Sequence, residues 1–122
     1  MIEFDLNNKV AIVTGGAQGF GLAISKRIIQ SGGKVVIWDI DEIVAKSALK
    51  EISSNNLSFK KVDVTNFIEI EKALEETENN LGKIDIFVNN AGITGMNAKI
   101  WDYPLDEWKK VIELDLNSTF YC

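Results

Sequence analysis

Three glycines and a later aspartate have the residue types and the spacing to bind a dinucleotide. Gly15, Gly19 and Gly21 follow the apolar run of residues 10–13, and an apolar helical pattern begins after them. A glycine turn between a strand and a helix leaves the helix amides free to bind a pyrophosphate. Asp39 follows Gly19 by twenty positions, and a carboxylate there can accept hydrogen bonds from both hydroxyls of an adenosine ribose. These residues predict half of a dinucleotide-binding site.

The three glycines have separate expected roles. Gly15 allows the sharp exit from the strand, Gly19 lets backbone amides approach a pyrophosphate, and Gly21 lets the helix pack close to the strand. Their spacing is Gly-x-x-x-Gly-x-Gly and not the more common Gly-x-Gly-x-x-Gly. From this pattern alone, a tight strand-to-helix turn without a ligand is the alternative.

The neighbours of these residues favour NAD over NADP. Gln18 precedes Gly19 and Ile40 follows Asp39, so no cation is placed to bind a ribose 2′-phosphate. The Asp39 carboxylate would repel that phosphate. We therefore predict NAD as the cofactor.

Strand and helix patterns alternate along the chain. Apolar runs predict strands over residues 10–13, 34–38, 57–62 and 84–88, and helical spacing predicts helices over residues 22–31, 41–53, 66–82 and 105–122. Right-handed crossovers place such strands in the order 3-2-1-4. The expected fold is α/β, a Rossmann-like doubly wound parallel sheet in one domain over residues 1–122. The turns at residues 15–21 and 89–93 then open into one crevice.

The patterns also predict which side chains are buried. The first three helices are expected to bury Ala23, Ile24, Ile28, Ile43, Ala48, Leu49, Ile52, Ile70, Ala73, Leu74 and Leu81. Asn66 and Glu69 form an expected capping box. Three aromatic residues, Trp101, Tyr103 and Trp108, are expected to anchor the loop and the last helix, because large rings are usually buried. The strand at 84–88 is expected to be buried on both faces.

The composition argues against several classes of protein. The net charge of −5, without any histidine, is unlike that of a nucleic-acid surface. Cys122 is the single cysteine, so we expect no internal disulfide and no metal site. No apolar run approaches the roughly 20 residues that cross a bilayer, and residues 1–8 are unlike a secretory signal. We expect a cytoplasmic protein without a membrane or nucleic-acid partner.

Two motifs resemble those of the short-chain dehydrogenase/reductase family. Thr14-Gly15-x-x-x-Gly19-x-Gly21 is similar to its nucleotide-binding motif, and Asn89-Asn90-Ala91-Gly92 to its second signature. The resemblance covers essentially the whole chain, as the N-terminal half of a family member. It implies an NAD-dependent oxidoreductase that transfers hydride between NAD(H) and a secondary alcohol or ketone and commonly forms homo-oligomers. The expected cofactor-binding residues are Thr14, Gly15, Gln18, Gly19, Phe20, Gly21, Asp39, Asp63, Val64, Asn89, Asn90, Ala91 and Gly92.

The resemblance also implies individual roles. Residues 89–92 run beside the adenosine half of the cofactor, and Asn90 helps to hold the sheet together. Asp63 faces the exocyclic amine of adenine and Val64 packs on the ring. For both segments an ordinary turn is the alternative. Residues 94–96, which are Thr94, Gly95 and Met96, belong to the loop that borders the nicotinamide and the substrate in that family.

The catalytic positions depart from the family pattern. Asp115 takes the place of the family's catalytic asparagine, and Asn117 cannot replace it, because residues two apart on a helix face different sides. The family's serine and Tyr-x-x-x-Lys are absent, since Tyr103 is followed four residues later by Glu107 and Tyr121 is the penultimate residue. We assign no catalytic residue. The chain is expected to be a dehydrogenase truncated before its later strands and inactive alone, with a non-catalytic NAD-binding or scaffold module as the alternative.

Overall fold

Four strands form the sheet at the centre of the structure, a computed structural model that describes residues 2–122. They are β1 (Val10–Thr14), β2 (Lys34–Asp39), β3 (Leu57–Lys61) and β4 (Ile86–Val88). All pairs are parallel, and the order is β3-β2-β1-β4. The predicted fold class and strand order are confirmed. A parallel order of this kind requires a crossover after each strand, and helices supply these crossovers.

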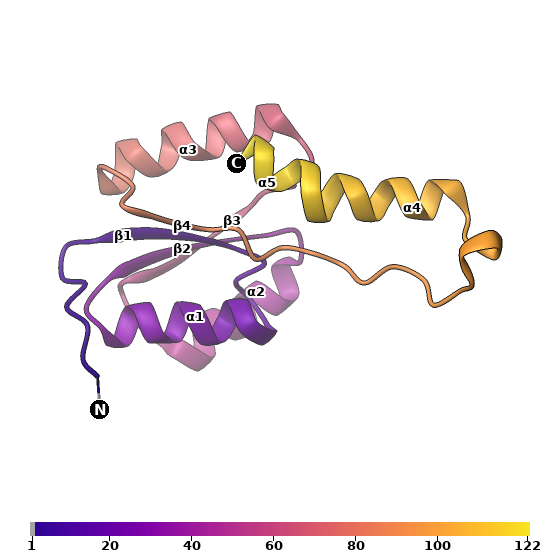
Figure 1. Cartoon of the computed structure of the whole chain (residues 1–122). Coiled ribbons are helices and arrows are strands. Elements are labelled where there is room, and N and C mark those ends of the chain that lie inside the picture. The colour runs from indigo at the N-terminus through magenta and orange to yellow at the C-terminus, as the bar shows by residue number, and fades with distance from the viewer. Residues whose placement is uncertain (1) are drawn as a thin grey trace.

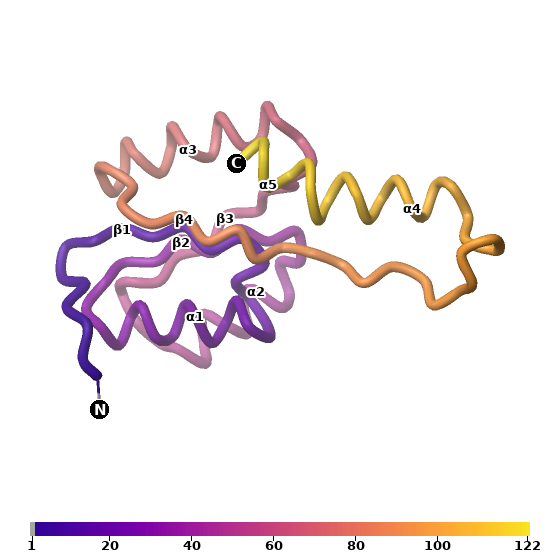
Figure 2. Tube along the Cα trace, in the orientation of Figure 1, coloured from indigo at the N-terminus to yellow at the C-terminus, as the bar shows by residue number. Residues whose placement is uncertain are grey.

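Helices cover both faces of the sheet (Figure 1). Helices α1 (Gly19–Gln30) and α2 (Glu42–Ile52) lie on one face, and α3 (Phe67–Leu81) lies on the other. After β4 the chain leaves the sheet as a long loop and returns through α4 (Leu105–Ile112), the π-helical turn η2 (Glu113–Asn117) and α5 (Ser118–Tyr121). The Cα trace shows this excursion most plainly (Figure 2). The last segment is thus one continuous helical run, as predicted, but it contains a π turn.

Side-chain caps fix where α2 and α3 begin. Asp41 accepts hydrogen bonds from the amides of Ile43 and Val44 at 3.0 and 3.1 Å, which satisfies two amides that lack a helical partner. Asn66 does the same at the start of α3. The predicted capping box is only half formed. The Glu69 carboxylate accepts from the Asp63 backbone amide at 2.8 Å and from the Asn66 side-chain amide at 3.4 Å, whereas the Asn66 backbone amide donates to the Asp63 carbonyl.

Apolar side chains form one core on each side of the sheet. Ala11, Val13 and Ile28 belong to the cluster under α1 and α2, whereas Ile12 and Ile70 belong to the cluster under α3. Alternate residues of β1 therefore enter different cores, and all five residues of the strand are buried. This double burial explains the uninterrupted apolar run in the sequence.

Two core positions predicted in the first three helices were wrong. Ala23 is exposed, because the sheet-facing side of α1 is taken by Gly21, Ser25 and Ile28, at helical spacing. Ile43 is 83% exposed. It lies in the first turn of α2, where its amide faces the Asp41 cap and the core contacts begin only later in the helix.

Strand β4 is shorter and less buried than predicted. It covers Ile86–Val88 and is half-buried, because among the described residues it pairs with β1 alone. Asp85 sits just before it. Its amide donates to the Val10 carbonyl at 2.9 Å, and its Oδ2 accepts from the Val10 amide at 3.0 Å. A side chain therefore joins β4 to the start of β1 where the strand pairing has not yet begun.

Replacing Asp85 with alanine should lower the melting temperature at neutral pH and have less effect in acid. The Val10 amide, Lys83 and Lys9 hold the pKa of Asp85 below its usual 3.8. A lowered pKa gives stability that is present above the unfolded-state value and is lost as the pH falls through the folded-state value. Thermal denaturation of both proteins at pH 7 and near pH 3 measures this. If the two proteins differed in melting temperature by the same amount at both pH values, the ionised Asp85 carboxylate would not be the source of the stability.

Candidate functional site

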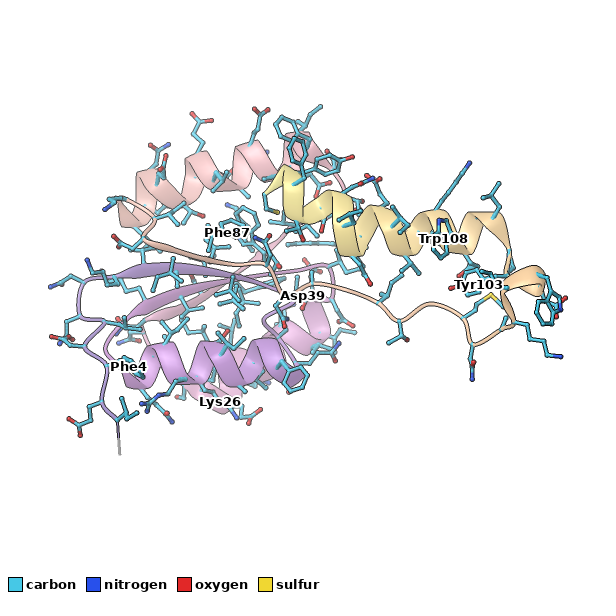
Figure 3. All side chains as sticks on the ribbon, in the orientation of Figure 1. Phe4, Lys26, Asp39, Phe87, Tyr103 and Trp108 are labelled. Carbon is cyan, nitrogen blue, oxygen red and sulfur yellow. The ribbon has the colours of Figure 1, made fainter. Side chains whose placement is uncertain are left out.

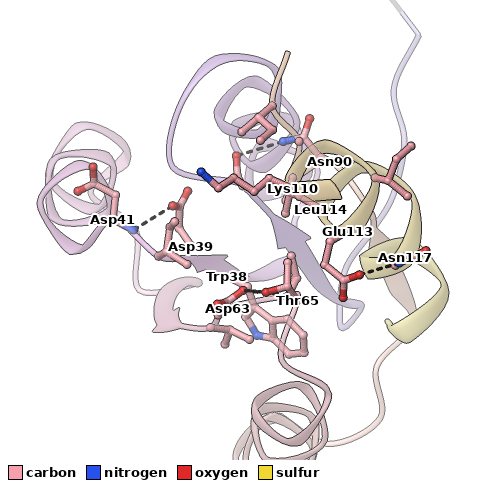
Figure 4. A pocket seen from close by; sticks show the side chains of 18 of the residues that line it. Trp38, Asp39, Asp41, Asp63, Thr65, Asn90, Lys110, Glu113, Leu114 and Asn117 are labelled. Atoms are coloured by element: carbon pink, nitrogen blue, oxygen red, sulfur yellow. Dashed lines mark hydrogen bonds between the residues drawn. The ribbon is translucent and has the colours of Figure 1, made fainter. Parts of the chain in front are cut away.

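One cleft of about 1340 Å³ lies at the carboxyl ends of the strands (Figure 4). Of the predicted site residues, those that line it are Gly15, Gln18, Asp39, Asp63, Val64, Asn90, Ala91 and Gly92. The loops after all four strands therefore meet, as expected for the switch point of such a sheet. Five predicted residues are not among the lining residues: Thr14, Gly19, Phe20, Gly21 and Asn89.

The opposite wall of the cleft comes from the last helical run, which the sequence interpretation missed. Its lining residues are Asp106, Trp108, Lys109, Lys110, Ile112, Glu113, Leu114 and Asn117. Several recur at intervals of three and four, so they share a helix face. That polar stripe was visible in the sequence, but nothing in the sequence places it opposite the strand ends.

Thr14 and Asn90 hold the two central loops together. The Thr14 hydroxyl accepts from the amides of Asn90 and Ala91, both at 3.0 Å, and donates to the Val88 carbonyl at 3.3 Å. The Asn90 side-chain amide donates to the carbonyls of Thr14 and Gly15, both at 3.1 Å. Thr14 is buried, so it shapes the cleft from behind.

The glycine turn has the geometry that its spacing indicates. Gly15 and Gly19 have φ of 59° and 55°, in the left-handed region where other residues are strained. A Cβ atom at Gly19 would have nothing within 4 Å, whereas one at Gly21 would overlap the Gly15 carbonyl oxygen and lie 2.5 Å from the Asn90 side-chain nitrogen. Gln18, the N-cap of α1, makes no side-chain cap bond, so it leaves the first amides of the helix uncapped.

Asp39 ends β2 at the rim of the cleft (Figure 3). Its Oδ1 accepts from the Asp41 amide at 3.1 Å, which orients the carboxylate. Among the described residues, neither Asp39 nor Asp41 forms an ion pair. No direct ion pair therefore neutralises these two carboxylates, and the lysines of the cleft, Lys109 and Lys110, belong to the helical wall.

Asp63 forms a turn and also lines the cleft. Its Oδ1 accepts both from the Thr65 amide at 2.9 Å and from the Thr65 hydroxyl at 2.7 Å. This is the local turn contact expected of an aspartate at a strand end. Contact with adenine stays a prediction for this residue.

Asp115, at the family's asparagine position, supports the loop after β4. Its Oδ1 accepts from the Ile93 amide at 2.8 Å and would lie 3.2 Å from a Cβ atom at Gly92. Asp115 is part of the π turn η2 and does not line the cleft. π turns occur frequently at functional sites. Here the turn holds an acidic side chain under the backbone of the cleft.

The loop between β4 and α4 is anchored by Tyr103 alone of the three aromatic residues. Its hydroxyl accepts from the Met96 amide at 3.0 Å and fills the space that a Cβ atom at Gly95 would need, and its ring packs edge-on against Trp108 with centroids 6.4 Å apart. Trp101 and Trp108 are 75% and 56% exposed, so their predicted burial was wrong. The reason is that both the loop, which holds Trp101, and α4, which holds Trp108, project away from the sheet (Figure 1). Residues 94–96 do not line the cleft.

Tyr121 and Cys122, at the end of the chain, are not activated. A hydrogen bond to Glu113 raises the pKa of Tyr121, and burial raises the pKa of Cys122 to about 11. Both groups therefore stay protonated at neutral pH, so neither supplies a phenolate or a thiolate there. The described residues contain no group of three or more potential metal ligands. No helix within residues 2–122 has the length and hydropathy to span a membrane.

Comparison with known proteins identifies the family. A family model described as short chain dehydrogenase matches residues 9–122. The chain belongs to the short-chain dehydrogenase family. The predicted family is therefore confirmed. The matched residues include every predicted site residue.

Two curated relatives differ in the cofactor that their names give. A 2-dehydro-3-deoxy-L-rhamnonate dehydrogenase (NAD(+)) of Sphingomonas sp. is 37% identical over 93% of this chain and 45% of its own length. A probable NADP-dependent mannitol dehydrogenase of Yarrowia lipolytica is 37% identical over 100% of this chain and 45% of its own. The chain thus spans about half the length of these relatives. Family membership leaves open the choice between NAD and NADP.

Solved structures share the fold closely. A short-chain dehydrogenase/reductase from Brucella melitensis superimposes with a TM-score of 0.90 at 26% identity, covering 98% of this chain and 51% of that one. A short chain dehydrogenase from Bacillus anthracis also gives 0.90, at 33% identity, covering 94% of this chain and 48% of that one.

Proposed function

We propose that this chain binds NAD and forms the cofactor-binding half of an NAD-dependent dehydrogenase or reductase. The observation that carries the proposal is that the glycine turn, the Asp39 carboxylate and the 89–92 turn border one cleft at the strand ends. The residues fit the cofactor. Gly19 leaves open space beside the uncapped first amides of α1, and an anion is favoured at such a helix end.

Different residues of the cleft bind different parts of the dinucleotide in this proposal. The backbone of Gly15, Gln18, Gly19, Phe20 and Gly21 holds the pyrophosphate. Asp39 accepts hydrogen bonds from the adenosine ribose, and Asp63 with Val64 borders the adenine. Thr14 and Asn89 to Gly92 form the wall beside the adenosine half. These assignments are supported by the lining of the cleft, which includes Gly15, Gln18, Asp39, Asp63, Val64, Asn90, Ala91 and Gly92.

The bound nicotinamide supplies hydride transfer to or from a secondary alcohol or ketone. The residues described here bind and orient that cofactor, and Asp115 fixes the loop after β4 through the Ile93 amide. Catalysis, the alcohol or ketone substrate, homo-oligomer formation and a cytoplasmic location are proposed for the whole polypeptide. A non-catalytic NAD-binding module is the second candidate, because these 122 residues contain no Tyr-x-x-x-Lys.

Gly19→Val should abolish NAD binding, with at least about a hundredfold loss of affinity, because the branched side chain fills the space where the pyrophosphate approaches the amides. Calorimetric titration with NAD measures the loss. Gly82→Val is the matched control. Gly82 also has a left-handed φ, 84°, and open space around its missing Cβ, but it ends α3 and does not line the cleft. The control should bind NAD like the parent, and unchanged affinity in Gly19→Val would overturn the proposal.

A further inference from the structure

Asp115 places a carboxylate directly behind the loop that follows β4. Its Oδ1 accepts a hydrogen bond from the Ile93 amide at 2.8 Å, and a Cβ atom at Gly92 would lie 3.2 Å from the same oxygen. Both Gly92 and Ile93 line the cleft. Among the described residues Asp115 forms no ion pair, so no direct cationic partner neutralises its charge.

The strand order indicates which half of a dinucleotide lies beside this loop. In the proposed function, on which this inference rests, the glycine turn after β1 binds the pyrophosphate and Asp39 at the end of β2 binds the adenosine ribose. The other half of the dinucleotide then continues past β1 on the side away from β2. The order β3-β2-β1-β4 places β4 on that side. We therefore expect the nicotinamide half near the loop after β4, where Ile93 lines the cleft.

Several carboxylates that line the cleft lie on the side of β2 and β3. Asp39 ends β2, Asp63 follows β3, and Figure 4 shows Glu113 across the cleft from Asp63. Asp106 lies in the first turn of α4, which projects away from the sheet (Figure 1). Asp115 differs from these residues because its carboxylate contacts the loop after β4. Its charge therefore acts mainly on the nicotinamide half.

We propose that the charge of Asp115 makes the site favour the oxidised cofactor, NAD+, over the reduced cofactor, NADH. The nicotinamide ring of NAD+ carries a positive charge and that of NADH carries none, whereas the other parts of the two molecules are identical. A carboxylate near the ring attracts the charged form and has little effect on the neutral one. For this two-electron couple, a tenfold change in the ratio of the two affinities shifts the reduction potential by about 30 mV. Asp115 therefore lowers the reduction potential of the bound couple.

Calorimetric titration with NAD+ and with NADH tests this role in the unaltered chain and in Asp115→Asn. Asparagine keeps an oxygen that can accept from the Ile93 amide and removes the charge. The ratio of the NAD+ affinity to the NADH affinity should fall about threefold, through weaker binding of NAD+. The expected change is small because the Asp115 side chain is exposed and water screens its charge. Asp115→Ser removes the same charge and should lower the ratio too, so the test does not depend on the folding of one variant.

Asp41→Asn is the matched control. It also removes one carboxylate that lines the cleft, after β2, and asparagine caps a helix about as well as aspartate. Because NAD+ and NADH have the same adenosine half, the ratio of their affinities should stay unchanged in this variant.

The outcomes separate this inference from the proposed function. Failure of the unaltered chain to bind either form of the cofactor contradicts the proposed function. Binding of both forms with a ratio that Asp115→Asn and Asp115→Ser leave unchanged overturns the electrostatic role of Asp115 alone. An equal fall of the ratio in Asp41→Asn also overturns it, because the effect would then come from the total charge of the cleft.

Discussion

Gly21→Ala is expected to destabilise the fold by about 3 to 5 kcal/mol, as overpacking combined with lost hydrogen bonds. A Cβ atom there overlaps the Gly15 carbonyl oxygen and lies 2.5 Å from the Asn90 side-chain nitrogen. Both neighbours are fixed, one by the backbone and the other by two hydrogen bonds that cross from the β4 loop to β1. The added methyl group must therefore separate α1 from the sheet. Urea denaturation followed by circular dichroism measures the loss.

Gly19→Ala is the control for this change. It meets no atom within 4 Å, so its cost is left-handed backbone strain, about 1 to 2 kcal/mol, partly offset by reduced freedom of the unfolded chain. An equal loss in the two variants would show that backbone strain, and not the close approach of α1, governs the turn.

The unaltered chain is expected to bind NAD at least about a hundredfold more tightly than NADP, because like charges brought together in a binding site cost several kcal/mol. Asp39 carries no ion pair in the described residues, so no direct partner neutralises its charge toward a 2′-phosphate. The cations of the cleft, Lys109 and Lys110, lie on the helical wall, where Lys110 is paired with Glu107. Asp39→Ala should weaken NAD binding about tenfold or more, the cost of lost hydrogen bonds to a charged group. It should also reduce the difference between the affinities for NAD and NADP. Calorimetric titration with both cofactors measures the two affinities.

Asp41→Asn is the matched control for the choice of cofactor. Asparagine caps a helix about as well as aspartate, so α2 is kept while a neighbouring charge is removed. The NAD preference should persist in this variant. Tighter binding of NADP by the unaltered chain would refute the assignment, a real alternative since one relative is named as NADP-dependent.

The sequence predicted the features that depend on short stretches of chain. The buried runs of β1 and β2 identify a parallel sheet because few other structures bury both faces of a strand. The turn at Gly15 and Gly19 was predictable because left-handed torsions need glycine. The alternation of strand patterns and helix patterns along the chain, with right-handed crossovers, then restricts the topology to one strand order.

Features that depend on tertiary contacts were not predictable. Ser25 carries no hydrophobic signal, so a buried position of α1 was assigned to Ala23, whereas Ile28 and the close approach at Gly21 were predicted correctly. The direction of the loop that exposes Trp101 is set by packing and not by its composition. The π turn also has no sequence periodicity of its own. It coincides with side-chain bonds of Glu113 and of Ser118, whose hydroxyl donates to the Leu114 carbonyl.

Hydrogen bonds of the Thr14 hydroxyl rigidly connect the loop after β1 to the loop after β4. It contacts a carbonyl of β4 and two amides beyond it, while its own backbone carbonyl accepts from Asn90. A displacement at the end of β1 is therefore transmitted to Asn90 and Ala91 without an intervening flexible segment. Order imposed by a pyrophosphate on the glycine turn would spread to the wall beside the adenosine, so the two halves of the binding surface would tighten in a single step.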